Sequence, residues 1–182
     1  MDWAKFGDYT AVAVLSGIRQ DSKLVEIDRF HGSSWKEQVD KAARMIAQYP
    51  KAQVLCDATG QGDPLVEMLR EKLPEHRIEG LHFTAPIKVE MVDRLAWMFE
   101  SEAIQMRPHP DLIRELQHFE TWETASGSKK YGAVSGSHDD LVIALALACR
   151  LLPHHYGTGV QVGAKRRFSK ERKSIDWDSF RL

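Results

Sequence analysis

The fold is decided by the stretch Gln-Val-Leu-Cys-Asp-Ala at residues 53–58, which continues as Thr-Gly-Gln-Gly-Asp-Pro at residues 59–64. The first half is short and apolar, is followed by turn residues and lies between two helical patterns, which is typical of a buried parallel strand. The final proline suits the first turn of a helix, and leucine then recurs at every fourth position over residues 65–73. The stretch therefore predicts a strand, a loop and a helix, with Asp57 at the end of the strand.

Upstream of this unit the sequence predicts a hairpin and a helix. Residues 8–18 and 23–30 are rich in apolar and β-branched side chains and are separated by a polar turn, so they are expected to pair as antiparallel strands. Ser34 and Glu37 form a capping box, and apolar residues then follow at helical spacing until about residue 49.

Downstream, the pattern predicts one more strand at residues 78–83 and helices that begin at Pro86 and Pro110. A second hairpin, rich in Gly, Ser and Thr, is expected at residues 121–137, and a helix that is apolar almost all round follows at residues 138–152. An antiparallel hairpin followed by alternating helices and strands predicts an α/β fold, in which helices flank a mixed sheet of the hairpin plus parallel strands.

Composition limits the class of protein. A chain of 182 residues with 43% hydrophobic and 28% charged residues suits one globular domain and excludes a disordered chain or a fibrous repeat. The longest apolar run, residues 141–149, is far shorter than the roughly 20 residues of a membrane-spanning helix. The two cysteines, Cys56 and Cys149, are too far apart in sequence for a usual zinc cage, and Cys56 is expected to be an inert buried thiol. Without a secretory signal at the N-terminus, we expect a cytoplasmic protein.

Charge is distributed unevenly along a chain whose net charge is only −1. Residues 153–182 carry seven Lys or Arg against three acidic residues, a net +4, so the remainder carries −5. Basic tails attract phosphate and clustered carboxylates hold metal ions, although a merely solvated tail has the same composition.

Three acidic positions stand at predicted strand ends or helix starts: Asp2, Asp57 and the pair Asp139–Asp140. A carboxylate at the end of an apolar strand is costly unless its charge is compensated, and a divalent cation compensates it. Each position alone also fits a structural role, since Asp57 can be a hydrogen-bonded strand-end carboxylate and the pair can cap a helix. Their convergence in one fold is what favours a metal site.

Three segments together resemble a known family. They are Asp-Trp-Ala-Lys-Phe-Gly-Asp-Tyr-Thr at residues 2–10, Cys-Asp-Ala-Thr-Gly-Gln-Gly-Asp-Pro at residues 56–64, and His-Asp-Asp-Leu-Val-Ile-Ala-Leu-Ala-Leu-Ala at residues 138–148. In this order and spacing they resemble the C-terminal nuclease domain of the large terminase subunit of tailed bacteriophages. The resemblance covers residues 2–152, so residues 1–152 are expected to form an RNase H-like nuclease domain and residues 153–182 a flexible basic tail.

The resemblance implies a metal-dependent endonuclease that cuts concatemeric viral double-stranded DNA during genome packaging. It implies that Asp2, Asp57 and Asp140 are the catalytic carboxylates, that they and Asp139 bind two Mg²⁺ or Mn²⁺ ions, and that Asp8 is auxiliary; which of Asp139 and Asp140 is the inner ligand stays open. His138, beside the aspartates, is a candidate for metal ligation or proton transfer, and a purely structural histidine is the alternative. Two such ions activate the attacking water and stabilise the leaving oxygen. The implied partners are DNA, an ATPase domain, the small terminase subunit and the portal, in the cytoplasm of the host.

The sequence departs from the family pattern at its start. In an RNase H-like fold the first catalytic aspartate follows a central strand, whereas only Met1 precedes Asp2, so the first strand is expected to be truncated. Residues 60–62 also lack the Gly-Lys-Ser/Thr that completes a phosphate-binding loop, so no DNA-translocating motor is predicted here.

Basic and aromatic residues outside the acidic positions are candidates for DNA contact. Lys88, Lys129 and Lys130 are predicted to contact phosphates, with Trp122 and Tyr131 on the same hairpin as the last two lysines. A solvated hairpin is the alternative. A further apolar cluster is interpreted as core, namely Met91, Trp97, Met98 and Phe99.

Two other functions stay open at this point. One is a nuclease of the same fold that resolves branched Holliday junctions, which would act as a dimer. The other is a DNA-binding or assembly module whose catalytic centre is impaired by the short first strand.

Overall fold

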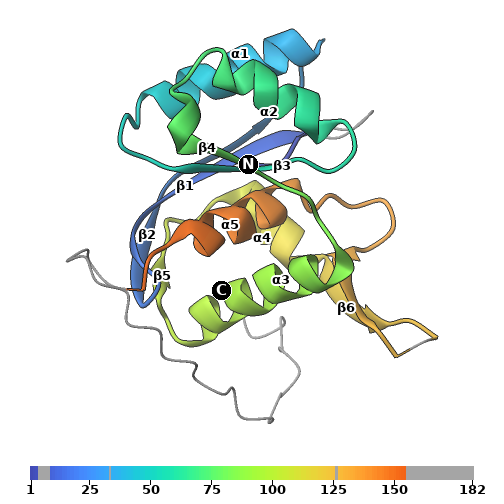
Figure 1. The fold of residues 1–182 in the computed structure, drawn as a ribbon. Helices are drawn as coiled ribbons and strands as arrows, with labels where there is room; N and C mark the ends of the chain where they lie inside the picture. The colour runs from blue at the N-terminus through green and yellow to red at the C-terminus, as the bar shows by residue number, and fades with distance from the viewer. Residues whose placement is uncertain (4–8, 33, 126, 155–182) are drawn as a thin grey trace.

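A computed structural model describes residues 1–3, 9–32, 34–125 and 127–154 (Figure 1). The strands are β1 (Thr10–Ile18), β2 (Asp21–Phe30), β3 (Val54–Asp57), β4 (Ile78–Leu81), β5 (Ile104–Gln105), β6 (Phe119–Glu123) and β7 (Lys129–Ala133). The helices are α1 (Trp35–Ala47), α2 (Gly62–Arg70), α3 (Ala85–Glu100), α4 (Pro110–Gln117) and α5 (Asp140–Leu151), with a short 3-10 turn at Glu75–Arg77. No helix in these described ranges is both long and apolar enough to cross a bilayer.

The predicted mixed sheet is confirmed. β1 pairs antiparallel with β2, β2 pairs parallel with β5, and β3 pairs parallel with β4. β5 was not predicted, because a strand of two residues leaves no periodic pattern in the sequence. The third, separate sheet is the β6–β7 hairpin, which was predicted.

Residues Met1–Trp3 join the β1–β2–β5 sheet to the β3–β4 sheet. The Met1 amino group donates to the Leu55 carbonyl at 2.8 Å and the Met1 carbonyl accepts from Asp57 N–H at 3.0 Å, as in a parallel ladder. On the other side, Asp2 exchanges two backbone hydrogen bonds of 2.9 Å with Ala11. The short first strand expected from the sequence thus lies between β1 and β3 and places Asp2 at the centre of the sheet.

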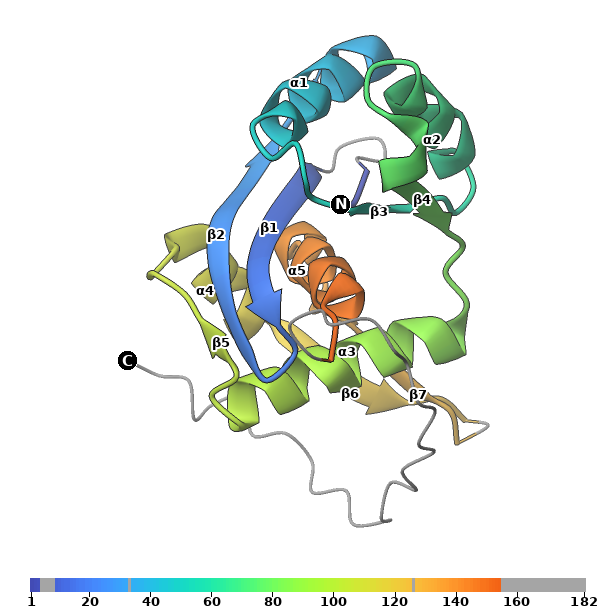
Figure 2. The same cartoon turned by 60° about the vertical axis from the view of Figure 1, so that its left-hand side comes forward.

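Helices cover both faces of the sheet (Figures 1 and 2). α1 and α2 bury one core against Met1, Trp3 and β3, and Ser34 caps α1 by accepting from Glu37 N–H, as the capping box predicts. α5 fills a second core on the opposite face together with α3 and α4. Because α5 packs on β1, β2, β3, α3 and α4, its apolar residues are buried nearly all round, which fixes the position of its first turn.

One core prediction is wrong. Met91 and Met98 are fully buried, but Trp97 is 43% exposed, because it lies on the solvent side of the amphipathic helix α3. The predicted thiol chemistry fits the structure: burial raises the pKa of Cys56 to about 11 and that of Cys149 to about 12, which keeps both thiols protonated.

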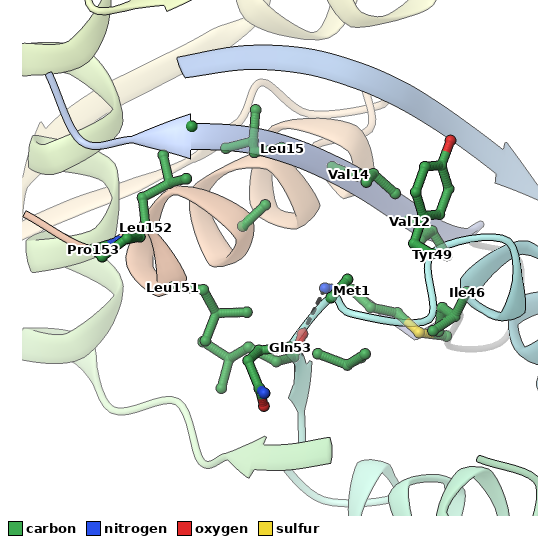
Figure 3. Close-up of a pocket in the computed structure, with 16 residues that line it drawn as sticks. Met1, Val12, Val14, Leu15, Ile46, Tyr49, Gln53, Leu151, Leu152 and Pro153 are labelled. Atoms are coloured by element: carbon green, nitrogen blue, oxygen red, sulfur yellow. Dashed lines mark hydrogen bonds between the residues drawn. The ribbon is translucent and has the colours of Figure 1, made fainter. Parts of the chain in front are cut away.

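A cavity of about 220 Å³ lies beside Met1 (Figure 3). It lies between the edge of β1 and residues 53–55, and the C-terminal turn of α5 contributes Ala148 and Leu151 to its wall. This volume far exceeds the about 10–15 Å³ that one water needs, and the space is partly open to solvent, so it is a pocket at the surface rather than an internal packing defect.

Candidate active site

The four predicted carboxylates come from elements that meet at the sheet centre. Asp2 belongs to the short strand between β1 and β3, Asp57 is the last residue of β3, Asp140 is the first residue of α5, and Asp139 is the N-cap of that helix. Parallel packing of the short strand on β3 brings the first two together, and burial of α5 under the same sheet brings the second two toward them.

The pKa of Asp2 reflects how close these carboxylates lie to one another. Burial raises the pKa of its carboxyl well above the usual value, and Asp57, Asp140 and Asp139 raise that pKa further, while the Met1 ammonium lowers it. The residue as a whole keeps some solvent-accessible surface, but its charge is unfavourable among three other carboxylates. A cation at this position would remove the repulsion.

Asp57 is held by the loop that follows β3. Its Oδ1 accepts a hydrogen bond of 2.8 Å from Thr59 N–H. A Cβ on Gly62 would lie only 2.3 Å from the Asp57 carbonyl oxygen, so only glycine lets the start of α2 pack this closely under the strand end. The glycine of the sequence motif therefore has a steric function.

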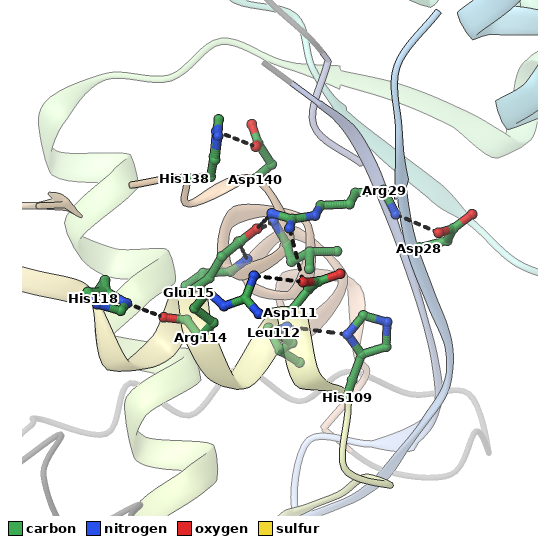
Figure 4. A network of polar contacts seen from close by, with 12 residues as sticks. Asp28, Arg29, His109, Asp111, Leu112, Arg114, Glu115, His118, His138 and Asp140 are labelled. Carbon is green, nitrogen blue, oxygen red and sulfur yellow. Dashed lines mark hydrogen bonds and ion pairs between the residues drawn. The ribbon is translucent and has the colours of Figure 1, made fainter. Parts of the chain in front are cut away.

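Asp140 is only 6% exposed and lies near His138, whose Nδ1 is 3.6 Å from its Oδ2 (Figure 4). Glu115 of α4 lies beneath the same turn and accepts hydrogen bonds from Leu141 N–H at 2.7 Å and Val142 N–H at 3.3 Å. Sequence reasoning missed Glu115. The available signal was a carboxylate three residues after Leu112 on the apolar face of an amphipathic helix.

Of the predicted DNA-binding lysines, Lys88 lies at the carboxylates, with its Nζ 3.3 Å from Asp139 Oδ2. Lys129 is bound within the protein instead: its Nζ is 3.3 Å from Asp93 Oδ1 and 4.5 Å from the centre of the Tyr131 ring. Tyr131 is buried and also donates its hydroxyl to Asp93, whereas the Lys129 side chain stays partly exposed beside it.

Lys130 and Trp122 are exposed on the same hairpin, the tryptophan by 46%. They remain available for contact with DNA, whereas Lys129 anchors the hairpin to α3. Asp8 falls outside the described residues, as does most of the basic tail.

The donor set fits a hard divalent cation, since Mg²⁺ and Mn²⁺ prefer carboxylate oxygens. Within the described residues, no three His, Cys, Asp or Glu side chains are yet close enough to hold one ion together. The four carboxylates are thus near enough to interact electrostatically but are not drawn into a coordination shell.

Comparison with known proteins gives relatives of one kind. The chain is 28% identical over 153 residues to the large terminase subunit of Thermus virus P23-45, an alignment that covers 81% of this chain and 30% of that protein. The large terminase subunit of Thermus phage G20c matches equally well. The chain therefore spans less than a third of the length of these relatives.

Solved structures agree with the fold. The large terminase nuclease from thermophilic phage G20c with bound magnesium matches with a TM-score of 0.64 and 25% identity, over 80% of this chain and 82% of that chain. The nuclease domain of the large terminase of bacteriophage SPP1 with bound Mn, at 19% identity and a TM-score of 0.57 over 82% of each chain, supports the fold alone.

A family model described as the terminase RNaseH-like domain matches residues 1–151. This range holds the whole sheet and both helical layers, including each of the four carboxylates described above. The chain therefore belongs to the family of terminase RNaseH-like domains.

Proposed function

We propose that this chain is a divalent-metal-dependent endonuclease that cleaves concatemeric viral double-stranded DNA during phage genome packaging. The observation that carries the proposal is the convergence of Asp57, Asp140 and Asp139 on Asp2. All three carboxylates raise the pKa of the Asp2 carboxyl. The match to the large terminase nuclease of phage G20c with bound magnesium supports the same chemistry.

In this proposal Asp2, Asp57 and Asp140 are the catalytic ligands of two Mg²⁺ or Mn²⁺ ions, and Asp139 is a further ligand. When bound, two such ions would activate a water and stabilise the leaving 3′ oxygen, so that no protein nucleophile would be needed. His138 lies 3.6 Å from Asp140 and orients it.

DNA contact is assigned to cations around the carboxylates. Lys88 pairs with Asp139 at 3.3 Å and offers its ammonium to the phosphate next to the scissile bond. Lys130 and Trp122 of the hairpin contact the backbone and bases further along the duplex, and the basic residues 153–182 add sequence-independent attraction to phosphate. Asp8 stays an auxiliary candidate.

The partners follow from the relatives. Because this chain matches 30% of a large terminase subunit, we propose that it works with an ATPase domain, the small terminase subunit and the portal, in the host cytoplasm.

One observation favours a second candidate, an impaired DNA-binding or assembly module. Among the described residues, no three of the candidate ligands are close enough together to hold one ion in this structure.

Plasmid digestion separates the candidates. Supercoiled plasmid and an excess of enzyme are incubated either with Mn²⁺ or with chelator. The active enzyme nicks and linearises DNA only with metal, and Asp57→Asn abolishes cleavage, whereas the control Asp63→Asn, in the first turn of α2, retains it. Metal-independent DNA binding without cleavage would establish the impaired module, and preference for four-way junctions over linear duplex would establish a resolvase.

A further inference from the structure

A buried network connects the two halves of the candidate site and centres on Glu115, a residue with no assigned role. Glu115 lies on α4 and is only 3% exposed. Its Oε2 accepts from Leu141 and Val142 N–H, and its Oε1 accepts from Arg29 Nη1 at 2.6 Å (Figure 4).

Glu115 replaces the usual cap of α5. An N-cap aspartate normally accepts a hydrogen bond from amides of its own first turn. Asp139 makes no such bond, and its carboxylate is instead directed to Lys88. Because Glu115 satisfies the free amides from another helix, Asp139 and Asp140 are both left to serve other functions.

The other end of the network reaches Asp2. Arg29 on β2 is the cross-strand partner of Ala11 on β1, and Ala11 exchanges two backbone hydrogen bonds with Asp2. Arg29 also lies 3.2 Å from Asp111, which keeps its guanidinium partnered on a second side. A continuous path of backbone pairing and charged hydrogen bonds thus runs from Asp2 through Arg29 and Glu115 to the first turn of α5.

We infer that Glu115 is a positioning residue. From α4 it accepts the two amide hydrogen bonds of the first turn of α5, and by holding this turn it sets the positions of Asp140 and Asp139 relative to Asp2. The inference rests on the proposed metal site and adds a residue to it. Glu115 acts through Leu141 and Val142 and does not touch substrate or metal. Partners of metal ligands commonly change metal affinity by about 10- to 100-fold when they are altered.

Two substitutions distinguish the effect of the length of the Glu115 side chain from the effect of its charge. Glu115→Gln keeps the length and an accepting oxygen but removes the charge, while Glu115→Asp keeps the charge but is one methylene too short to reach the amides. Asp111→Asn is the matched control, because Asp111 lies on the same helix and contacts the same Arg29 but caps nothing. Mn²⁺ binding to the full chain is measured by titration calorimetry, with thermal unfolding in chelator as a check of folding.

The inference predicts that Glu115→Asp weakens Mn²⁺ binding by about tenfold or more, that Glu115→Gln stays within about threefold of the wild type, and that Asp111→Asn is unchanged. Wild-type affinity in Glu115→Asp, or equal losses in both Glu115 variants, would overturn it. If only Glu115→Gln folds, its affinity decides alone, and a tenfold loss overturns the inference. Asp57→Asn is the reference variant. If Asp57→Asn loses Mn²⁺ binding and Glu115→Asp does not, only the positioning role fails. If the wild type takes up no Mn²⁺, or if Asp57→Asn binds Mn²⁺ as the wild type does, the proposed function itself fails.

Discussion

The Lys88 ammonium lies 3.3 Å from the Asp139 carboxylate, at the edge of the candidate metal centre. Both side chains are partly buried, so this ion pair is screened less than one on an open surface. In the absence of metal, Lys88 is therefore a counter-ion for one of the four clustered carboxylates.

Replacing this lysine should affect metal and DNA in opposite directions. Lys88→Met removes a cation that competes with the metal, so Mn²⁺ is expected to bind a few-fold more tightly in calorimetry. Cleavage at saturating metal should fall by about tenfold or more, since a phosphate contact is lost. Lys41→Met, a lysine on α1 that packs over Phe30, is the control and should change neither. Weaker Mn²⁺ binding in Lys88→Met would contradict this arrangement.

Asp2 should destabilise the metal-free fold at neutral pH. Its pKa is raised in the folded state by burial and by the other carboxylates, so the native state binds this proton more tightly than the unfolded state does. The free energy of unfolding therefore decreases as pH rises from the unfolded value of about 3.8 through the raised pKa, and the loss is complete above it. Thermal melts of wild type and Asp2→Asn in chelator across this pH range measure the difference.

Asp2→Asn should melt at a higher temperature than the wild type near pH 7 in chelator, and the gap should close at acidic pH. Mn²⁺ should raise the melting temperature of the wild type more than that of the variant. Asp63→Asn, at an exposed position, serves as the control. A variant that is less stable than the wild type in chelator at pH 7 would show that the carboxylate is not repelled.

Lys129 and Lys130 of the β6–β7 hairpin are expected to have different functions. Lys130→Gln is expected to reduce the slope of log affinity for duplex DNA against log salt by about 0.9, as for the loss of one phosphate contact, with no change in melting temperature. Lys129→Gln should leave that slope unchanged and lower stability slightly, since its partner is Asp93. Fluorescence anisotropy with labelled DNA at several salt concentrations measures the slopes, and the reverse assignment of the two effects would refute it.

The cavity beside Met1 predicts a stabilising substitution. Ala148 faces this cavity, so Ala148→Leu is expected to fill part of it and to raise the melting temperature by about 2–4 °C, corresponding to about 1 kcal/mol. Ala144, one turn earlier on α5, is fully buried in the packed core, so Ala144→Leu should destabilise by about 1–3 kcal/mol. If both substitutions lower the melting temperature equally, the prediction is wrong, because a leucine at position 148 would then find no free space.

Sequence periodicity was sufficient for the elements that bury one continuous face. The β1–β2 hairpin, β3 with its following loop, and the buried helix α5 all follow from apolar spacing and turn residues, because burial imposes those patterns. Asp2, Asp57 and the pair Asp139–Asp140 could be selected because each stands at a predicted strand end or helix start, but the choice of Asp140 within the pair rested on the resemblance to the terminase family.

Side-chain partners that depend on tertiary packing could not be predicted in this way. Nothing local distinguishes Lys129, which binds Asp93, from Lys130, which is exposed, and Trp97 differs from its neighbours only in the direction it faces on α3. The Arg29–Glu115 network joins residues 86 positions apart, so its partners are set by the packing of α4 on the sheet rather than by any motif.

The central claim is that distant aspartates share divalent ions. Its most direct test is a crystal of the full chain soaked in Mn²⁺, with data collected to record the anomalous signal of manganese. We expect anomalous peaks with oxygens of Asp2, Asp57 and Asp140 at roughly 2.0–2.3 Å, and the loss of these peaks in Asp57→Asn. A crystal structure in which these three side chains lie apart, with no anomalous peak among them, would contradict the shared metal site.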